Sequence, residues 1–401
     1  MTVVILFSAY FLVNFFKQSS NIVIPMFSQM FGFSNSVQGF LTAIYFLPYA
    51  LVQLSAGALC RRFSSTKVAG CSLLIASLGA ACLSYAGGLS SVGDVSSVGT
   101  AWIVLGRFLT GLGTGSIFIS VINFENINYS GRKYAVMVGV GFMASSLGTV
   151  CSVVPLKLLL DRFGIRYAFM IITVVVASLG LVLVSLKKQG TVDSVGSIVV
   201  ELKNASKEIA SSRILIWGTI IWAAYVSIQN SYSGMWCTTW ASYAFPDMLK
   251  YAGVFGTLYA LSVMTGCLLA EVCHRKTTSY LQYNIRISYL FAFTFSAVVI
   301  AHFISVFGFA VLAVALFGFS TGIISVVPMA VCKEVATEQN CSSISGIWNF
   351  AASILVLVVQ WTSGVLIDLL EYNRALTVFA VLYLLCTVVF SVRCGKKNLK
   401  V

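Results

Sequence analysis

Apolar runs of ~20 residues recur along the whole of this 401-residue chain, and a helix of that length crosses a ~30 Å bilayer core. Lipid cannot satisfy backbone hydrogen bonds, so such runs must form helices or closed barrels, and only helices need runs this long. Charged residues make up 9% of the chain, against ~25% in soluble domains. The sequence therefore predicts an all-α polytopic membrane protein.

Twelve membrane-spanning segments can be drawn along the chain, joined mostly by short connections. The exception, from Lys187 to Ser212, is polar and separates six segments from six. We predict an N-terminal six-helix bundle over residues 1–188, a cytoplasmic linker over 189–212 and a C-terminal six-helix bundle over 213–401. The expected segments are 3–27, 36–60, 68–90, 100–124, 134–157, 167–187, 213–240, 250–272, 282–304, 306–331, 342–366 and 374–394.

Lysine and arginine gather in alternate loops, which predicts the orientation because cytoplasmic loops are enriched in both. The enriched loops include Arg61, Arg62, Arg132 and the lysines of the central connection. We therefore expect a multi-pass protein of the cell membrane (inner or plasma membrane), with the N- and C-termini in the cytoplasm. The net charge of +13 is read as a topology signal, so no nucleic-acid partner is expected.

The two halves repeat short patterns in the same order, a feature of many transporters. Such fragments can match by chance in apolar sequence, but their shared order makes chance a poorer explanation. The matching positions are Gly111 and Gly318, Gly115 and Gly322, Glu125 and Glu334, and Asp161 and Asp368.

Three local patterns resemble the major facilitator superfamily. The run Arg107-Phe-Leu-Thr-Gly111-Leu-Gly113 is similar to the family's fourth-helix motif, RxxxGxG, and residues 160–169 resemble its turn into helix six. Glu125, followed seven residues later by Arg132, resembles its cytoplasmic glutamate–arginine pair. The resemblance covers nearly the whole chain. It implies two pseudo-symmetric six-helix bundles, a central cavity lined by helices one and four, and secondary transport by alternating access.

The loop after the second segment departs from the family pattern, with Arg61 where an acid is expected and Ser64 where glycine is expected. The fifth segment also lacks the proline and final glycines of the antiporter pattern, which favours a symporter or uniporter over a drug/proton antiporter. We expect a cytoplasmic gating network of charged residues, formed by Arg62, Glu125, Arg132 and Glu334.

Two cations lie inside membrane segments, where an unpaired charge is costly. Lys17 lies ~21 Å from the cytoplasmic end of its helix and Arg107 ~10 Å from the outer end of its own, so their heights nearly coincide in a ~30 Å core. No carboxylate lies well inside any segment. Two cations without an acid favour an anionic substrate. Alternatively, Arg107 belongs to a packing helix, since Gly111 and Gly115 form a GxxxG contact.

Other polar and aromatic side chains follow helical spacing and could line the same site. Aromatic and amide groups together suit a hydroxylated ligand, although an aromatic packing stripe is the competing interpretation. The expected substrate-binding residues besides the two cations are Asn14, Gln18, Asn21, Tyr45, Tyr49, Tyr225, Gln229, Tyr232, Trp348 and Asn349.

We interpret the chain as a secondary active transporter of a small organic anion, either an acidic sugar or a carboxylate, with H⁺ or Na⁺ as candidate coupling ions. The alternatives are a neutral-sugar symporter, a drug or metabolite exporter and, from another class, a non-transporting receptor or scaffold. No Walker A motif, paired metal-type cysteine spacing or nucleophile–base pair is evident among its residues. We therefore expect no enzyme activity and no cofactor, and a monomer in the lipid bilayer.

Overall fold

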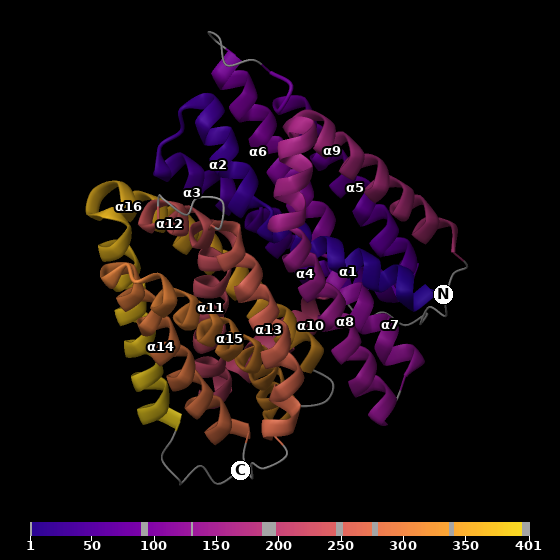
Figure 1. Cartoon of the computed structure of the whole chain (residues 1–401). Coiled ribbons are helices and arrows are strands. Elements are labelled where there is room, and N and C mark those ends of the chain that lie inside the picture. Colours follow the sequence, from indigo (N-terminus) through magenta and orange to yellow (C-terminus); the bar gives the residue numbers. More distant parts are fainter. Residues whose placement is uncertain are drawn as a thin grey trace.

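The computed structural model describes residues 2–89, 95–129, 131–186, 198–245, 252–274, 280–336 and 341–394. Helices account for nearly all of these residues (Figure 1). Eight helices are long and apolar enough to cross a membrane within the described ranges, or ten if two bent pairs each count as one span. The prediction of an all-α polytopic membrane protein is confirmed.

Breaks inside the predicted segments divide the N-terminal half into shorter helices. The first segment bends by 41° between its two helices, at Ser19. The second breaks at Ile44 and Tyr45, four and three residues before Pro48, whose ring clashes with the carbonyl of residue i−4. The sixth segment begins at Gly164, which has a φ of 72°. The helices are α1 (Thr2–Gln18), α2 (Ser20–Phe31), α3 (Asn35–Ala43), α4 (Phe46–Phe63), α5 (Ser65–Ala86), α6 (Val95–Thr114), α7 (Ile117–Asn128), α8 (Gly131–Cys151) and α9 (Val154–Ser185).

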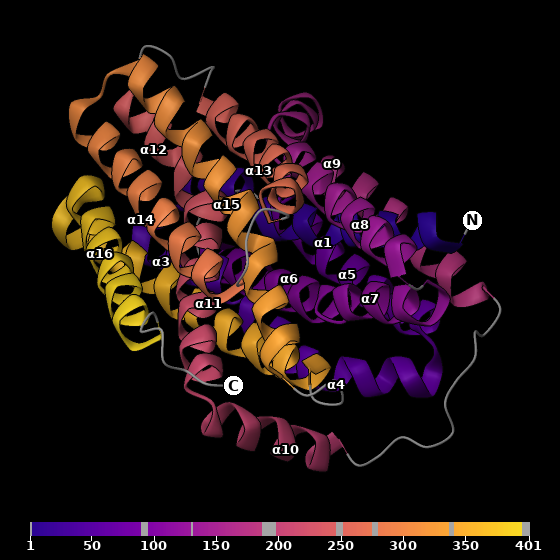
Figure 2. The same cartoon turned by 90° about the horizontal axis from the view of Figure 1, so that it is seen from below.

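The C-terminal half is built in the same way. A π-helical turn, η1, interrupts the seventh segment, and α16 contains the eleventh and twelfth segments with a break at Glu371. The amphipathic helix α10 packs against α11 and α16 and lies across one end of the molecule (Figure 2). The elements are α10 (Ile198–Ser211), α11 (Arg213–Ser231), η1 (Tyr232–Trp236), α12 (Cys237–Ala244), α13 (Ala252–His274), α14 (Tyr280–Ile304), α15 (Phe307–Val335) and α16 (Cys341–Cys394).

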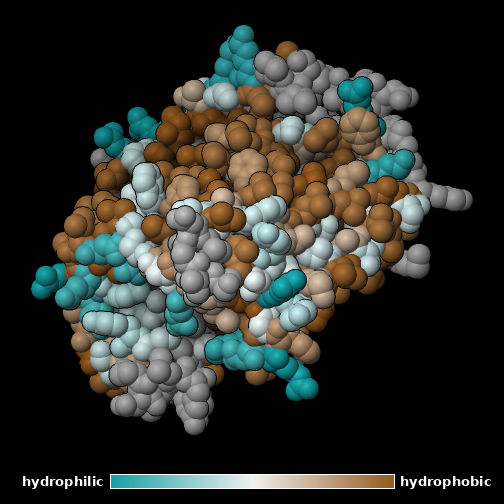
Figure 3. Space-filling model, turned by 90° about the horizontal axis from the view of Figure 1, so that it is seen from above, coloured by the Kyte–Doolittle hydropathy of each residue, from teal (hydrophilic) through white to brown (hydrophobic). Residues whose placement is uncertain are grey.

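Each half buries its own apolar core, so the molecule consists of two bundles (Figure 1). Fully buried Phe16, Phe27 and Phe169 belong to the first core, and Trp240 and Phe317 to the second. Many large hydrophobic side chains are exposed in both halves, and the face seen in Figure 3 carries broad hydrophobic areas with hydrophilic residues among and around them. An apolar exterior of this extent is what lipid-facing helices require.

Glycines bring the fourth segment against the second, as the GxxxG pattern predicts. A Cβ atom at Gly111 would lie 2.0 Å from the carbonyl oxygen of Tyr45, and one at Gly115 would lie 2.8 Å from that of Tyr49. No side chain fits at 2.0 Å, so the two backbones touch only because these residues are glycine. The predicted close contact is confirmed.

The C-terminal half repeats this contact between α15 and α13. A Cβ atom at Gly318 would lie 2.6 Å from the carbonyl oxygen of Tyr259, and one at Gly322 would lie 2.1 Å from that of Val263. In each half the tyrosine hydroxyl also contacts a threonine of the glycine helix, Thr114 or Thr321. The repeats in the sequence therefore correspond to equivalent packing in two pseudo-symmetric bundles.

Candidate functional site

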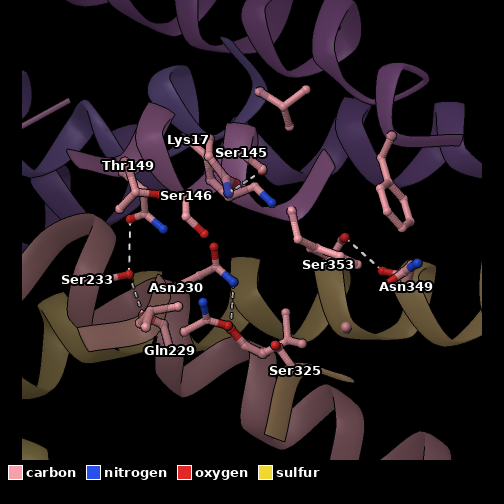
Figure 4. A pocket seen from close by; sticks show the side chains of 18 of the residues that line it. Lys17, Ser145, Ser146, Thr149, Gln229, Asn230, Ser233, Ser325, Asn349 and Ser353 are labelled. Carbon is pink, nitrogen blue, oxygen red and sulfur yellow. Dashed lines mark hydrogen bonds between the residues drawn. The ribbon is translucent and has the colours of Figure 1, made fainter. Parts of the chain in front are cut away.

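A cavity with about 1170 Å³ of empty space lies between the two halves. Helices of both halves face each other across it, with Lys17 and Ser145 on one wall and Gln229, Asn349 and Ser353 on the other (Figure 4). Its polar lining residues are Asn14, Lys17, Gln18, Gln53, Ser145, Ser146, Thr149, Gln229, Asn230, Ser233, Ser325, Asn349 and Ser353, and its aromatic ones are Tyr10, Phe46, Tyr49, Phe118, Phe142, Trp222, Tyr225 and Tyr259.

One end of the cavity is closed where α1 and α2 meet η1 and the start of α12. The Ser233 hydroxyl donates to Oε1 of Gln18 at 3.1 Å, and the backbone N–H of Thr238 donates to Oδ1 of Asn21 at 3.4 Å. Both contacts form where the helices are irregular, at the bend after α1 and at the π-helical turn. These two hydrogen bonds join the halves and close this end of the cavity. We call them the cap.

Beyond this cap, on the side away from α10, Asp368 of α16 joins the halves at the start of α3. Its carboxylate accepts from Nδ2 of Asn35 and from the backbone N–H of Ser36, both at 2.8 Å, and also contacts the Ser36 hydroxyl. A carboxylate at a helix N-terminus satisfies free N–H groups and complements the helix dipole. Nearby, a Cβ atom at Gly364 would lie 2.3 Å from the Asn35 carbonyl oxygen, so the backbones also touch.

Within the described part of the chain, Lys17 is the only charged side chain that lines the cavity. It is half-buried, and its Nζ lies 4.8 Å from the ring centroid of Tyr49 and 5.9 Å from that of Phe46. The one ion pair formed within the described residues is Lys157–Asp161, at 3.4 Å. The ammonium group therefore rests on aromatic faces, which attract a cation, but no carboxylate neutralises it there.

Amides and hydroxyls surround the lysine and are partly engaged with one another. Asn14 Nδ2 donates to the Ser145 hydroxyl at 2.7 Å, and Trp222 Nε1 donates to Oδ1 of Asn349 at 3.3 Å. Gln53 is 3% exposed and its Oε1 has no hydrogen-bond partner. The cavity thus offers donors and acceptors on several walls, which a ligand with hydroxyl groups can use.

Arg107 lies outside the cavity lining and is almost fully buried. Its guanidinium donates to the carbonyl oxygens of Phe16 at 3.0 Å, Thr42 at 3.2 Å and Leu41 at 3.3 Å, and it stacks over the ring of Tyr45 at 4.8 Å. These carbonyls lie in the last turns of α1 and α3, where helix oxygens lack intrahelical partners and the helix dipole is negative. Backbone oxygens, rather than a ligand or Lys17, therefore surround this cation.

The predicted substrate-binding residues divide into two groups. Tyr45 contacts Thr114, Asn21 lies in the cap, Tyr232 packs in the aromatic core of the C-terminal half, and Trp348 packs against Gly218. These four, with Arg107, do not line the cavity. Those that do are Asn14, Lys17, Gln18, Tyr49, Tyr225, Gln229 and Asn349.

Sequence reasoning missed the small hydroxyl residues of the cavity. Ser145 and Thr149 in α8, like Asn349 and Ser353 in α16, are four residues apart and share a helical face. That spacing was a usable signal. It is weak because serine and threonine inside membrane helices commonly bond to their own backbone, as Ser353 does to the Asn349 carbonyl.

The residues of the predicted gating network have different surroundings. Glu125 is fully buried, although it lies near the end of its segment, and Arg62 is exposed. The side chains of Arg132 and Glu334 lie outside the described residues. The network therefore stays a prediction.

Two pseudo-symmetric helical bundles around a central polar cavity are the architecture of many secondary transporters. Within that class, the family model described as "Major Facilitator Superfamily" matches residues 6–354. The chain belongs to this superfamily and is a multi-pass membrane transporter. The comparison with curated protein sequences gave no match.

Solved structures of the same fold align with nearly the whole chain. The xylose transporter of E. coli, in a partially occluded inward-open conformation, aligns with a TM-score of 0.76 and 14% identity, covering 100% of this chain and 98% of that one. A D-xylose–proton symporter aligns at 0.75 and 14%, covering 97% and 96%. A POT family transporter in complex with 5-aminolevulinic acid aligns at 0.74 and 12%, covering 99% and 96%.

Proposed function

We propose that this protein is a secondary active transporter of a small organic anion, either an acidic sugar or a carboxylate. One observation carries the proposal: among the described residues that line the cavity, Lys17 is the single charge and none is an acid. An ammonium group in low dielectric gains most from an anionic partner. The sequence predicted that Lys17 and Arg107 bind the anion together. Because Arg107 lies outside the cavity lining, the anion would bind to Lys17 alone.

The cavity places hydrogen-bonding groups within reach of the rest of such a ligand. The amides of Gln229 and Asn349 lie across from Lys17 (Figure 4), and the face of Tyr225 adds an apolar surface. A hydroxylated carbon skeleton would bind to the amides and the aromatic ring, with its carboxylate on the lysine. This division is why an acidic sugar fits the lining as well as a simpler carboxylate.

The direction of access follows from the position of the cavity. Its cap and the Asp368 contacts lie on the side away from α10, so the halves are joined there. By the positive-inside rule, α10 and both termini would lie in the cytoplasm of a cell-membrane protein. This conformation would then be inward-facing, and loss of the outer contacts would accompany opening to the other side. The protein would act as a monomer.

Coupling to a cation is part of the proposal. A D-xylose–proton symporter has the same fold, and an uphill anion carrier needs an ion gradient to drive it. A proton or Na⁺ would serve, and uptake into proteoliposomes with either gradient imposed alone distinguishes the two. Uptake insensitive to both gradients indicates a uniporter or exchanger.

Matched ligands and a matched variant test the anion site. We expect glucuronate to stabilise the purified protein thermally more than glucose, which has the same ring without the carboxylate. Lys17→Met keeps the chain that packs on Tyr49 but removes the charge. We expect it to weaken glucuronate binding ~10- to 100-fold, the effect of losing ~1.5–3 kcal/mol from a charged hydrogen bond.

The second candidate is a neutral-sugar symporter, which the amides and serines of the cavity favour. Equal stabilisation by glucose and glucuronate, unchanged in Lys17→Met, would replace the anion proposal with this one. Stabilisation by apolar cations alone would indicate a drug exporter. Ligand binding without uptake into proteoliposomes would indicate a receptor or scaffold.

A further inference from the structure

Glu125, in the last turn of α7, is buried completely, and neither carboxyl oxygen has a hydrogen-bond partner. It lies among the α10-side ends of α1, α7 and α8. A Cβ atom placed on Gly141 of α8 would lie 3.3 Å from Oε1 of Glu125 and 3.3 Å from the ring of Phe7 of α1. The carboxyl group therefore lies close to the backbone of α8, at a point that the ring of Phe7 also approaches.

The titratable groups of the surrounding helices do not neutralise this carboxyl group. Tyr10 of α1 is a titratable side chain close enough to interact electrostatically with Glu125. Tyr10 also lines the cavity. Arg62 of α4 and Lys67 of α5 are exposed, and Arg62 stacks on Phe63. The side chains of Arg132 and Lys133, at the start of α8, lie outside the described residues. No cation of the described part of the chain pairs with Glu125.

A buried carboxylate without a hydrogen bond or counter-ion is strongly disfavoured relative to its neutral acid. A buried neutral acid costs less, since no charge loses its water. Both observations, complete burial and two unpartnered oxygens, favour the protonated form of this group over its carboxylate.

We propose that Glu125 is a proton-binding site whose occupancy is linked to the conformation of the transporter. In the conformation seen here the carboxyl group is protonated. Its O–H bond breaks when rearrangement of α1 and α8 exposes the group to water or to a cation, and the proton passes to water on the α10 side. The proposal does not depend on which substrate the cavity binds.

Linkage fixes the sign of the pH dependence. A conformation that holds a proton is favoured at low pH, and a conformation that releases it is favoured at high pH. Raising the pH should therefore shift the protein away from the form with the cavity open toward α10. Glu125→Gln, which mimics the neutral acid, should remove this dependence.

Infrared difference spectroscopy of the reconstituted protein tests for the proton directly, without a ligand. We expect the carbonyl stretch of a protonated carboxyl group at neutral pH in the unsubstituted protein, and its loss in Glu125→Gln. Asp161→Asn is the matched control, because Asp161 is half-exposed and paired with Lys157. This control should keep the band.

Glu125→Met, an apolar side chain of similar length, provides a second variant should Gln fold poorly. Both are neutral, so failure of both to fold would mean that the structure needs the negative charge, and the proposal would be wrong. Identical spectra for the unsubstituted protein and Glu125→Gln at neutral pH would overturn it equally.

A conformational readout completes the test. A Ser353→Cys reporter, in the cavity wall, is labelled in inverted vesicles with a membrane-impermeant thiol reagent, using the chain without this substitution to measure background. Because the reactive thiolate fraction itself rises with pH, each rate is divided by that of an exposed Ser206→Cys reporter labelled at the same pH. We expect this ratio to fall several-fold as the pH rises, and to be independent of pH when Glu125→Gln is added. The same pH dependence with and without Glu125→Gln would show that another group binds the proton.

Discussion

The surroundings of Arg107 show how an intramembrane charge can be satisfied by backbone alone. The guanidinium binds carbonyl oxygens at the ends of two helices, α1 and α3. Both helices end inside the membrane-spanning segments, and every free carbonyl there needs a donor. One arginine therefore stabilises two breaks, and it ties the fourth segment to the first and second.

Arg107→Lys tests this interpretation. Lysine keeps the charge, but its compact ammonium cannot match a fork that reaches carbonyls of two helices. We expect the free energy of unfolding to fall by ~1.5–3 kcal/mol, the value of one hydrogen bond to a charged group, while glucuronate binding persists. Thermal denaturation in detergent, with and without ligand, measures both quantities.

Arg62→Lys is the matched control, because Arg62 is exposed and should tolerate the change. If Arg107→Lys is as stable as the unsubstituted protein but no longer binds glucuronate, Arg107 belongs to the anion-binding site, as the sequence predicted. The charge of Arg107 and its depth could be predicted from the sequence. The partners of Arg107 could not be predicted. They are carbonyl oxygens at helix ends, and the positions of those ends depend on packing as well as on Pro48.

At the scale of the helix, Asp368 and Asp161 show how equivalent positions acquire different roles. The repeat in the sequence pairs them correctly, yet Asp161 forms an ion pair with Lys157 on its own helix. Asp368 instead binds the N-terminus of α3 in the other half. A sequence repeat predicts equivalent positions within each bundle. It does not predict which helix end of the opposite bundle lies beside each aspartate.

Asp368→Asn should weaken closure on the side away from α10. The substitution keeps the shape but removes the charge that complements the α3 dipole, an effect of ~0.3–2 kcal/mol. That range corresponds to a ~2- to 30-fold shift in the open-to-closed ratio. Labelling of a Ser233→Cys reporter in the cap, from the side away from α10, measures the shift.

Asp161→Asn, made in the same reporter background, controls for loss of a surface carboxylate. It should leave the labelling rate of Ser233→Cys unchanged. Equal rates in the two variants would mean that the Asp368 contacts do not hold the closed state.

At the scale of the whole molecule, the apolar runs and the glycine pattern were enough to predict two bundles of helices. The cavity was predicted in part: Lys17, Gln229 and Asn349 line it, whereas Tyr232 and Trp348 pack in the core. Polar and aromatic residues occur both on the helix face that packs in the core and on the face that lines the cavity. Their spacing in the sequence therefore does not show which of the two faces lines the cavity. The conformation could not be predicted, because alternative states differ by only a few kcal/mol.

Orientation decides which compartment this conformation opens to, so it is the prediction with the widest consequence. Ser206 on α10 is exposed, and Arg162, just before the break at Gly164, is exposed at the opposite end of the bundle. In intact cells, we expect Ser206→Cys to require a membrane-permeant thiol reagent and Arg162→Cys to react with an impermeant one. The reverse result would place α10 outside the cell. Because the cap and the Asp368 contacts close the far side, the cavity would then face outward.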